Sequence, residues 1–443
     1  MKIHTYWYAL FAWFLFVSSV NIVLAQAKVP PSEQFQYVNE GEFDTEDPAE
    51  YGADTRCLPF ARPFALCFYN VTPNEFTLAI RMGTHDVDFI LRRWVWEANV
   101  GNPVKDNATL TFRQDGNLVL AHVDGRVAWQ TGTANKGVVG FRILDNGNMV
   151  LYDSKGKYVW QSFDSPRNTL LVGQSLRPKT GPYKLVSRSL SSPDGNGPYT
   201  LILEPKRLVL QYTAPNLDKP VVYYVIENTF EPYATLFAKP AEGTSTQLGL
   251  VTPGTNPIEY DFDRPKYNAT LSFLRLESNG NLVVYTYYDQ VTYEAEDVTY
   301  ALFNRELNNN ECLLPERCGE FGLCQDSQCV ACPSDKGLLG WSSKCKYEKP
   351  KSCDPKTFHY YKLEGVDHFM TKYTSGSVVK VEECGRRCTR DCKCLGYFYN
   401  KESSKCWIAY DLKTLASVLV YDSETPERVP DLTRVAYIKT PNV

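Results

Sequence analysis

One phrase of the sequence occurs twice and limits the folds open to the chain more than any other feature. Residues 115–130 read DGNLVLAHVDGRVAWQ, and residues 146–161 read NGNMVLYDSKGKYVWQ. Asn117 and Asn148 are 31 positions apart, as are Trp129 and Trp160, which follow the second turn of each copy. A unit this short buries its apolar face only by packing on copies of itself. The phrase therefore predicts a repeated β-architecture built from hairpins.

Short strands separated by turn residues are expected on both sides of the phrase. Asp-Gly and Asn-Gly pairs between alternating apolar segments are typical of hairpins. Trp96, Trp129 and Trp160 end three successive blocks, which predicts three small sheets around a shared centre. The expected strands are 76–82, 88–96, 108–112, 118–123, 149–153, 158–160, 199–205, 207–213, 221–226, 271–277 and 281–288. The chain is rich in aromatic residues, with 29 Tyr and 22 Phe, and has only 4 Met, which also favours a mainly β body.

The N-terminus and the cysteines together indicate secretion. Residues 1–25 carry a charge, a long apolar core and then small residues, as a cleaved signal peptide does; the alternative is an uncleaved membrane anchor. Of the 14 cysteines, 12 follow residue 311, which predicts a disulfide framework. The pair Cys57–Cys67 is the simplest local disulfide. Sequons at Asn70, Asn107 and Asn268 predict surface glycans.

Length and charge limit the remaining function classes. A chain of 443 residues is expected to form two to four domains. The net charge of −4 and the lack of a strongly basic run argue against nucleic acid and anionic membranes as partners. Residues 26–50 are polar and acidic and are interpreted as a loosely ordered leader.

Specific strings in the chain resemble a known family. WVWEANVGNPV, QDGNLVL, the Trp-ending repeats and WQSFDSPRNTLLVGQSL are similar to the bulb-type mannose-binding lectin domain at the head of S-locus glycoproteins and S-domain receptors of plants. The likeness is nearest to the epidermis-specific secreted glycoproteins, relatives that lack the kinase. The resemblance implies a β-prism II lectin domain at 45–165 and a second, divergent prism-like domain at 171–308.

The cysteine-rich part resembles two further modules. Residues 309–347, around RCGEFGLC, are similar to an EGF-like module, and residues 353–438 are similar to an α+β PAN/apple domain. VEECGRRCTRDC at 381–392 predicts a helix that carries two cysteines on one face. The EGF-like and PAN resemblances imply the disulfides Cys312–Cys324, Cys318–Cys329, Cys332–Cys345, Cys384–Cys406 and Cys388–Cys394, and leave Cys353–Cys392 as the remaining pair. A zinc site at Cys329 and Cys332 is the rival interpretation, which secretion and the lack of a nearby His disfavour.

The family resemblance also defines a candidate sugar site. Bulb-type lectins hold mannose with Gln-X-Asp-X-Asn-X-Val-X-Tyr, in which alternate side chains line one face of a strand. The matching positions are, in the first copy, Arg113, Asp115, Asn117, Val119 and Ala121; in the second, Leu144, Asn146, Asn148, Val150 and Tyr152; and in the third, Glu277, Asn279, Asn281, Val283 and Tyr285. No copy keeps the whole motif. A structural role for these turn-forming phrases is favoured over sugar binding.

An enzymatic function is not expected. The five His show no metal-ligand spacing, and no nucleophile elbow or P-loop occurs. We therefore expect a secreted, non-catalytic glycoprotein of the plant extracellular space or cell wall, with no cofactor and no metal. Its partners would be mannose-type glycans or other secreted glycoproteins. One alternative places recognition on the PAN/apple domain, with an inert lectin head; a carbohydrate-active enzyme is the other.

Overall fold

The computed structural model describes most of the chain after the expected signal peptide. The described residues are 27–44, 50–59, 63–83, 92–205, 207–214, 217, 219–227, 233–240, 246–252, 259–262, 269–288, 296–305, 310–422 and 427–442. The signal peptide at 1–25 and the sequon at Asn268 lie outside them. The chain forms two compact units: Met1–Glu40, Asn107–Arg142 and Met149–Gln161 make the first, and Gly41–Asp106, Ile143–Asn148 and Ser162–Val443 make the second.

Two small antiparallel sheets make up the first unit. One has the order β1-β6-β7-β8 and consists of β1 (Phe35–Val38), β6 (Thr109–Phe112), β7 (Leu118–Ala121) and β8 (Val127–Gln130). The other has the order β11-β10-β9 and consists of β9 (Val138–Ile143), whose last residue falls outside this unit, β10 (Met149–Asp153) and β11 (Tyr158–Gln161). Trp129 and Trp160, at the ends of the repeated phrases, pack edge to face with ring centroids 5.8 Å apart.

The expectation of a loosely ordered leader over 26–50 is wrong for its middle part. Phe35–Val38 forms an edge strand that pairs with β6, and the Phe35 ring packs against Phe112 and Phe141 at 5.8 and 5.6 Å. The alternating side chains of this strand supply apolar contacts although the surrounding segment is acidic.

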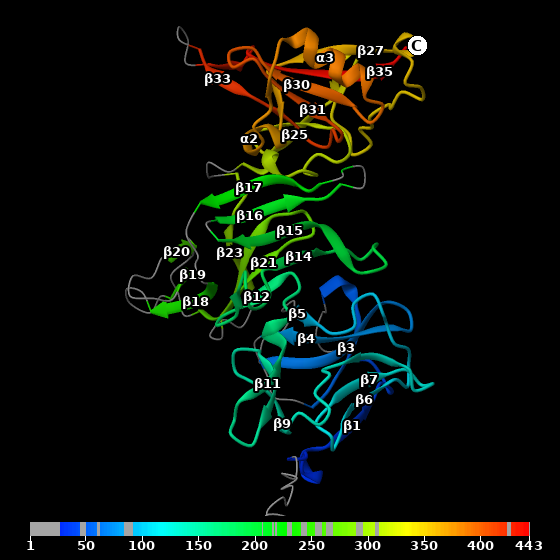
Figure 1. The fold of residues 1–443 in the computed structure, drawn as a ribbon, viewed down its shortest axis with the longest axis vertical. Coiled ribbons are helices and arrows are strands. Elements are labelled where there is room, and N and C mark those ends of the chain that lie inside the picture. Colours follow the sequence, from blue (N-terminus) through cyan, green and yellow to red (C-terminus); the bar gives the residue numbers. More distant parts are fainter. Residues whose placement is uncertain are drawn as a thin grey trace, which may run out of the picture. The chain divides into compact units, whose positions relative to one another are not determined.

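The second unit begins with a four-stranded antiparallel sheet. Its strands are β2 (Asp54–Cys57), β3 (Phe64–Thr72), β4 (Glu75–Met82) and β5 (Arg93–Glu97), in that order. Cys57 and Cys67 face each other across β2 and β3 and form a disulfide. Figure 1 shows strands β3 and β4 of this sheet, which pair from Phe64 to Thr72.

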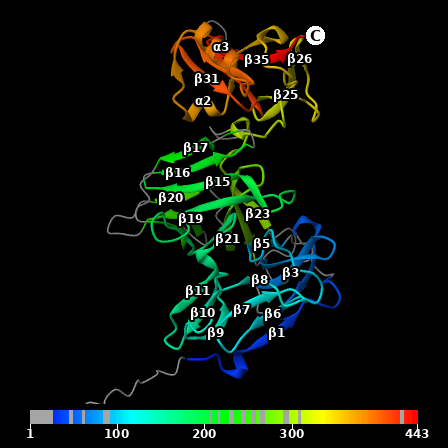
Figure 2. The same cartoon turned by 45° about the vertical axis from the view of Figure 1, so that its right-hand side comes forward.

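Three further four-stranded sheets follow within the second unit (Figure 2). The first sheet contains β12 (Thr169–Leu171), β21 (Ala269–Leu276), β22 (Leu282–Tyr288) and β23 (Glu296–Ala301); the second contains β13 (Ser175–Leu176), β18 (Ala234–Pro240), β19 (Thr246–Val251) and β20 (Glu259–Phe262); the third contains β14 (Lys184–Arg188), β15 (Asn196–Glu204), β16 (Arg207–Tyr212) and β17 (Val221–Glu227). Leucines and the buried rings of Tyr199, Tyr212 and Tyr223 fill their common core.

The EGF-like and PAN modules share one five-stranded sheet. Its order is β26-β25-β24-β32-β28, with β24 (Leu323–Gln325), β25 (Gln328–Ser334) and β26 (Gly337–Gly340) from the first module and β28 (Val366–His368) and β32 (Leu415–Ser417) from the second. Strand β24 runs parallel to β32, with Leu323 opposite Leu415. The hydrophobic core beneath this sheet contains residues of both modules, among them Phe321 and Leu363. The two modules are therefore one folding unit.

The remaining PAN elements surround a second five-stranded sheet. Its order is β27-β35-β30-β31-β29, with β27 (Phe358–Glu364), β29 (Ser377–Val378), β30 (Gly396–Asn400), β31 (Lys405–Ala409) and β35 (Arg434–Pro441). The short strands β33 (Leu419–Tyr421) and β34 (Arg428–Pro430) form a hairpin, and α2 (Met370–Tyr373) is a single turn. Helix α3 (Val381–Arg390) begins with glutamates and ends with arginines, which complements the helix dipole. The 3₁₀ turns are η1 (Pro31–Glu33), η2 (Glu50–Gly52), η3 (Ser162–Asp164), η4 (Glu311–Leu313) and η5 (Pro355–Thr357).

Seven disulfides join all 14 cysteines, and each pair is one that the sequence and its resemblances imply. They are Cys57–Cys67, Cys312–Cys324, Cys318–Cys329, Cys332–Cys345, Cys353–Cys392, Cys384–Cys406 and Cys388–Cys394. The buried Cys384 and Cys388 attach α3 to the strands beside it. Among the described residues, no helix has the length and apolarity needed to cross a membrane.

Candidate functional site

The three turn phrases share one local geometry. In each, the carboxamide or carboxylate oxygen of the first polar residue accepts the backbone N–H two positions later. The acceptors Asp115, Asn146 and Asn279 lie 3.0, 3.2 and 2.9 Å from the nitrogens they bind. The glycine between has φ of 82–86° in all three phrases, a conformation that glycine adopts without steric cost. The sequence therefore forms the same Asx-type hairpin turn three times.

The central Asn of each phrase is used inside the fold. Oδ1 of Asn117, Asn148 and Asn281 accepts the backbone N–H of Thr133, Phe163 and Phe303 at 3.1, 3.3 and 3.0 Å. Nδ2 of Asn117 donates to Oε1 of Gln130, and Nδ2 of Asn281 donates to the carbonyl oxygen of Phe303, both at 2.8 Å. These three side chains are 4–8% exposed. Each amide links its turn to the segment that follows the second strand after the turn, so these amides are not available to a sugar.

The remaining positions of the lectin motif are also packed. Val119, Val150 and Ala121 are buried. The ring of Tyr152 lies against Gly140, where an added Cβ would stand 2.3 Å from the Tyr hydroxyl oxygen. The structure thus places most of the predicted sugar positions fully or partly in the interior, while Arg113, Asn146 and Asn279 are exposed.

In the third phrase, Tyr285 is part of a buried polar cluster. Its hydroxyl donates to Oε1 of Glu277 at 2.9 Å, and its ring stacks on Phe273 with centroids 5.2 Å apart. The guanidinium of Arg93 lies 3.9 Å from the ring centroid. Burial and the nearby charge of Glu277 raise the pKa of Tyr285, which keeps the hydroxyl protonated. Val283 beside it is 6% exposed.

Buried carboxylates in this region are paired with arginines. Glu50 accepts from Arg275, which is 1% exposed, and from Arg93 at 3.1 Å; Arg93 also pairs with Glu296. Burial acts to lower the pKa of Arg275, but the charges of Glu50 and Glu277 outweigh that effect and raise it. The cluster joins β5 to β21 and β23. It has the character of an internal structural network, not of an acid–base pair facing a substrate.

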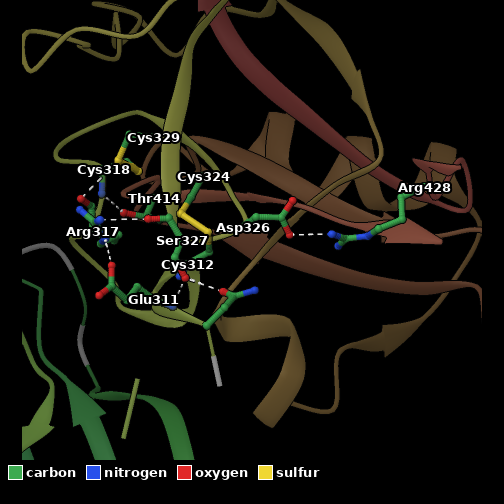
Figure 3. Close-up of a disulfide and its surroundings, with 11 residues drawn as sticks. Glu311, Cys312, Arg317, Cys318, Cys324, Asp326, Ser327, Cys329, Thr414 and Arg428 are labelled. Atoms are coloured by element: carbon green, nitrogen blue, oxygen red, sulfur yellow. Dashed lines mark hydrogen bonds and ion pairs between the residues drawn. A yellow bond between two sulfur atoms is a disulfide. The ribbon is translucent and has the colours of Figure 1, made fainter. Parts of the chain in front are cut away.

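The EGF-like disulfides are surrounded by a second hydrogen-bonded cluster, shown in Figure 3. Arg317 donates to Glu311 at 2.7 Å and to the carbonyl oxygen of Ser327 at 2.9 Å. Asp326 and Ser327 have φ of 48° and 63°, and Asp326 pairs with Arg428 of the PAN module at 2.8 Å. The N–H of Cys318 donates to Oγ1 of the buried Thr414 at 2.8 Å. These bonds hold the two modules in register around the shared sheet.

A cavity of about 530 Å³ opens beside that sheet. Its walls come from both modules and contain three lysines, three aromatic rings and three hydroxyl side chains: Lys336, Lys344, Lys346, Phe321, Tyr347, Tyr361, Ser334, Ser342 and Thr440. The sequence prediction of recognition sites did not include these residues. The sequence feature that could have indicated them is the excess of five lysines over two acidic residues between positions 335 and 351. These lysines are not consecutive, so they do not form a basic run.

A second cavity of about 350 Å³ is lined by the PAN module, including Trp407 and Phe369, and by Leu217 and Val221. His368 also lines it. Burial lowers the pKa of His368 to about 3, so this ring is neutral at ordinary pH. Its ring packs against Phe369 and Phe398.

Two of the predicted glycosylation sites lie within the described residues. Asn107 is exposed, whereas Asn70 lies in β3 with a side chain only 4% exposed, which argues against a glycan at that position.

In the part of the chain that the structure describes, no group of three His, Cys, Asp or Glu residues could hold a metal ion. Cys329 and Cys332, the pair considered for zinc, are both in disulfides.

Comparison with known proteins agrees with this architecture. A family model described as D-mannose binding lectin matches residues 93–188, and one described as PAN-like domain matches residues 353–412. The chain is 53% identical to EP1-like glycoprotein 3 of Arabidopsis thaliana over 437 residues, which cover 96% of each chain. It is 50% identical to the epidermis-specific secreted glycoprotein EP1 of Daucus carota, over 76% of this chain and 92% of that one.

More distant relatives carry an additional catalytic part. The G-type lectin S-receptor-like serine/threonine-protein kinase SD2-5 of Arabidopsis thaliana is 26% identical over 71% of this chain but only 37% of its own length. The similarity to the EP1-like proteins is greater and extends over nearly the whole length of both chains. The chain therefore belongs to the EP1-like glycoprotein family.

Proposed function

We propose that this chain is a secreted, non-catalytic glycan-binding protein of the plant cell wall, whose recognition surface lies on the joined EGF-like and PAN modules. The observation that carries this proposal is the use of Asn117, Asn148 and Asn281 as internal hydrogen-bonding groups. A sugar site at the repeated phrases would need those amides. The prism domains then serve as a scaffold that positions the C-terminal part.

The joined modules have the features that a recognition surface requires. They hold an open cavity with mixed polar and aromatic walls. Six disulfides and the shared sheet constrain the backbone of the joined modules, and Cys332–Cys345 lies at the cavity itself. Preformed, rigid sites lose less entropy on binding than flexible ones.

Secretion and the lack of catalysis are part of the same proposal. The apolar N-terminus, the seven disulfides and the printed name of the carrot relative support secretion. The most similar relatives are named as glycoproteins, and the buried carboxylates of the second unit are neutralised by arginines. The cell-wall location is part of the proposal because a secreted plant protein that binds glycans meets them there.

Weak mannose binding by the prism is the second candidate. The match of residues 93–188 to the D-mannose binding lectin model favours it, and Asn146 remains exposed at a motif position. One shallow site of this kind would bind near the millimolar range, or about 4 kcal/mol, and would depend on several sites acting together.

A glycan array probed with the full mature chain separates the two candidates. Variants Asp115→Ala and Asn146→Ala remove polar groups of the phrases, whereas Lys344→Glu and Lys346→Glu change the cavity wall. We expect binding to survive the first pair and to fall with the second pair. Binding that is lost only in the prism variants would contradict the proposal in favour of mannose recognition, and a chain that binds no glycan would contradict both candidates.

A further inference from the structure

Five lysines gather on one short segment of an otherwise acidic protein. This lysine cluster consists of Lys336, Lys344, Lys346, Lys349 and Lys351. Only Asp335 and Glu348 offset it within 335–351, whereas the whole chain has a net charge of −4. All five lysines are exposed. Within the described ranges, no ion pair involves any of their ammonium groups, although 17 ion pairs occur elsewhere in those ranges. Among the described residues, the cluster is therefore a net positive charge without an ion-pair partner.

A disulfide fixes the centre of the cluster beside the cavity. Lys344 and Lys346 stand on either side of Cys345, which is 7% exposed and joined to Cys332 of β25. The backbone N–H of Lys344 also donates to Oγ of Ser342 at 3.1 Å. Both lysines line the cavity together with Lys336, from the turn before β26. Three ammonium groups thus surround one opening at anchored backbone positions.

The carboxylates of Asp335 and Glu348 also line the cavity, so its three lysines leave a net charge of +1 (3 − 2), and rings and hydroxyls complete the wall. Phe321, Tyr347 and Tyr361 contribute aromatic surface, and Ser334, Ser342 and Thr440 contribute hydroxyl groups. Next to the cavity, Trp341 is 45% exposed, which is unusual for so large an apolar side chain. Aromatic faces pack on the apolar side of sugar rings, and hydroxyls exchange hydrogen bonds with theirs.

We propose that the lysine cluster and its cavity bind an acidic polysaccharide, a polymer of uronic acid residues. The ammonium groups would pair with the carboxylates, while the aromatic and hydroxyl groups contact the sugar rings. A polymer with one carboxylate in each residue meets successive lysines along 344–351, so that weak contacts add up. This inference rests on the proposed function, since it names the ligand class of the same surface.

An acidic peptide is the competing ligand for such a surface. It would gain affinity by adding a strand to β26, the outer strand of the shared sheet. However, β26 has only four residues and a glycine at each end, Gly337 and Gly340, which makes it a poor template for a ladder. The wall chemistry and the short edge together favour the polysaccharide.

The test uses the full mature chain and immobilised polygalacturonate. Its methyl-esterified form has the same backbone without the charges, and polyglutamate supplies the same charge on a peptide. We expect the K344E/K346E variant to bind polygalacturonate about tenfold or more weakly, and higher salt to weaken wild-type binding as well. K344R/K346R should keep most of the affinity. The matched control is K155E/K157E, two exposed lysines with the same spacing between β10 and β11.

Several outcomes would overturn the inference. They are equal binding of the methyl-esterified polymer, an equal loss in K155E/K157E, and no loss in K344E/K346E. Lysine-dependent binding of polyglutamate at matched affinity would assign the surface to acidic proteins instead. Binding of neutral glycans that K344E/K346E abolishes would refute the uronate assignment yet leave the proposed function standing. Equal unfolding midpoints for the variants and the wild type guard against misfolding, because all four substituted side chains are exposed.

Discussion

Asn117, Asn148 and Asn281 occupy the position at which bulb-type lectins present an amide to a sugar, yet each binds the backbone of its own domain. The central Asn of each phrase thus has a structural role, although other positions of the motif differ from the family pattern. The first polar residue of each turn has a lighter role, because its side chain closes the turn, and in the second and third phrases it is exposed. The two kinds of position should therefore respond differently to substitution.

Substituting Asn281 should destabilise the protein more than substituting Asn279. Asn281→Ala leaves the buried N–H and carbonyl oxygen of Phe303 without their side-chain partner, at a cost of about 1–3 kcal/mol. Asn279→Ala removes one exposed turn contact and should cost about 0.5–1 kcal/mol. Urea unfolding measures both. Equal, small losses would show that the central amide is not structural.

Acid should weaken the fold through His368. Its pKa is lowered to about 3 in the folded chain, against about 6.5 when exposed. Between these values the unfolded chain holds the extra proton, so the free energy of unfolding falls as pH falls below 6.5. The loss reaches about 2 kcal/mol at pH 5.

A comparison of variants isolates this contribution. His368→Gln should show a smaller drop in unfolding free energy between pH 7.5 and pH 5 than the wild type, by about 2 kcal/mol. His359, an exposed residue of β27, is the control, and His359→Gln should leave the drop unchanged. The same drop in all three proteins would mean that His368 does not titrate as its burial implies.

At the scale of elements, local patterns predicted hairpins well and missed what depends on distant partners. Turn pairs and alternation located the strands around both phrases, and the spacing of Cys384 and Cys388 located α3. Strand β1 was missed because it has four residues in an acidic segment and pairs with β6, more than 70 positions away. No local signal in the sequence records such a pairing.

The candidate sites were also hard to predict, because they too depend on contacts between distant residues. The phrases themselves could be read as turns, but the N–H groups that occupy their amides lie 15 to 22 positions later. The lysine cluster was visible only as scattered residues, because a disulfide and a shared sheet bring them around one cavity. The family resemblance predicted the fold and the disulfides. Whether the sugar positions are open to a ligand depends on contacts that exist only in the folded chain.

The ion pair between β21 and Glu50 should be a strong link between elements. Arg275→Met leaves the carboxylate of Glu50 buried without its main partner, and we expect a loss of about 3–5 kcal/mol. The double variant Glu50→Gln with Arg275→Met should lose less, since no buried charge remains unpaired. Arg207→Met is the control, because its pair with Glu204 is exposed and worth at most about 1 kcal/mol. A similar loss in the single and double variants would refute the role of the unpaired charge.

At the scale of the whole molecule, the EGF-like and PAN modules should not be separable. A chain that ends at residue 352 lacks β32 and β28, which exposes the edge of β24 and removes 10 of the 13 buried residues of the core under the sheet. We expect it to be secreted poorly and to form mixed disulfides. The variant C353S/C392S keeps the shared sheet and should still be secreted. Normal yield and native disulfides in the shortened chain would show that the first module folds alone.

The parallel pairing of β24 with β32 also imposes an order in time. Leu323 and Leu415 are 92 positions apart, and β24 has no partner on that side until the later strand has been made. At about 5–20 residues per second, synthesis leaves this edge open for roughly 5–20 s. During that interval the nearby thiols can oxidise, so mispaired disulfides can form before the sheet is complete. Correct pairing of the EGF-like cysteines in the secretory pathway thus depends on the later arrival of β32 and on exchange of any mispaired disulfides.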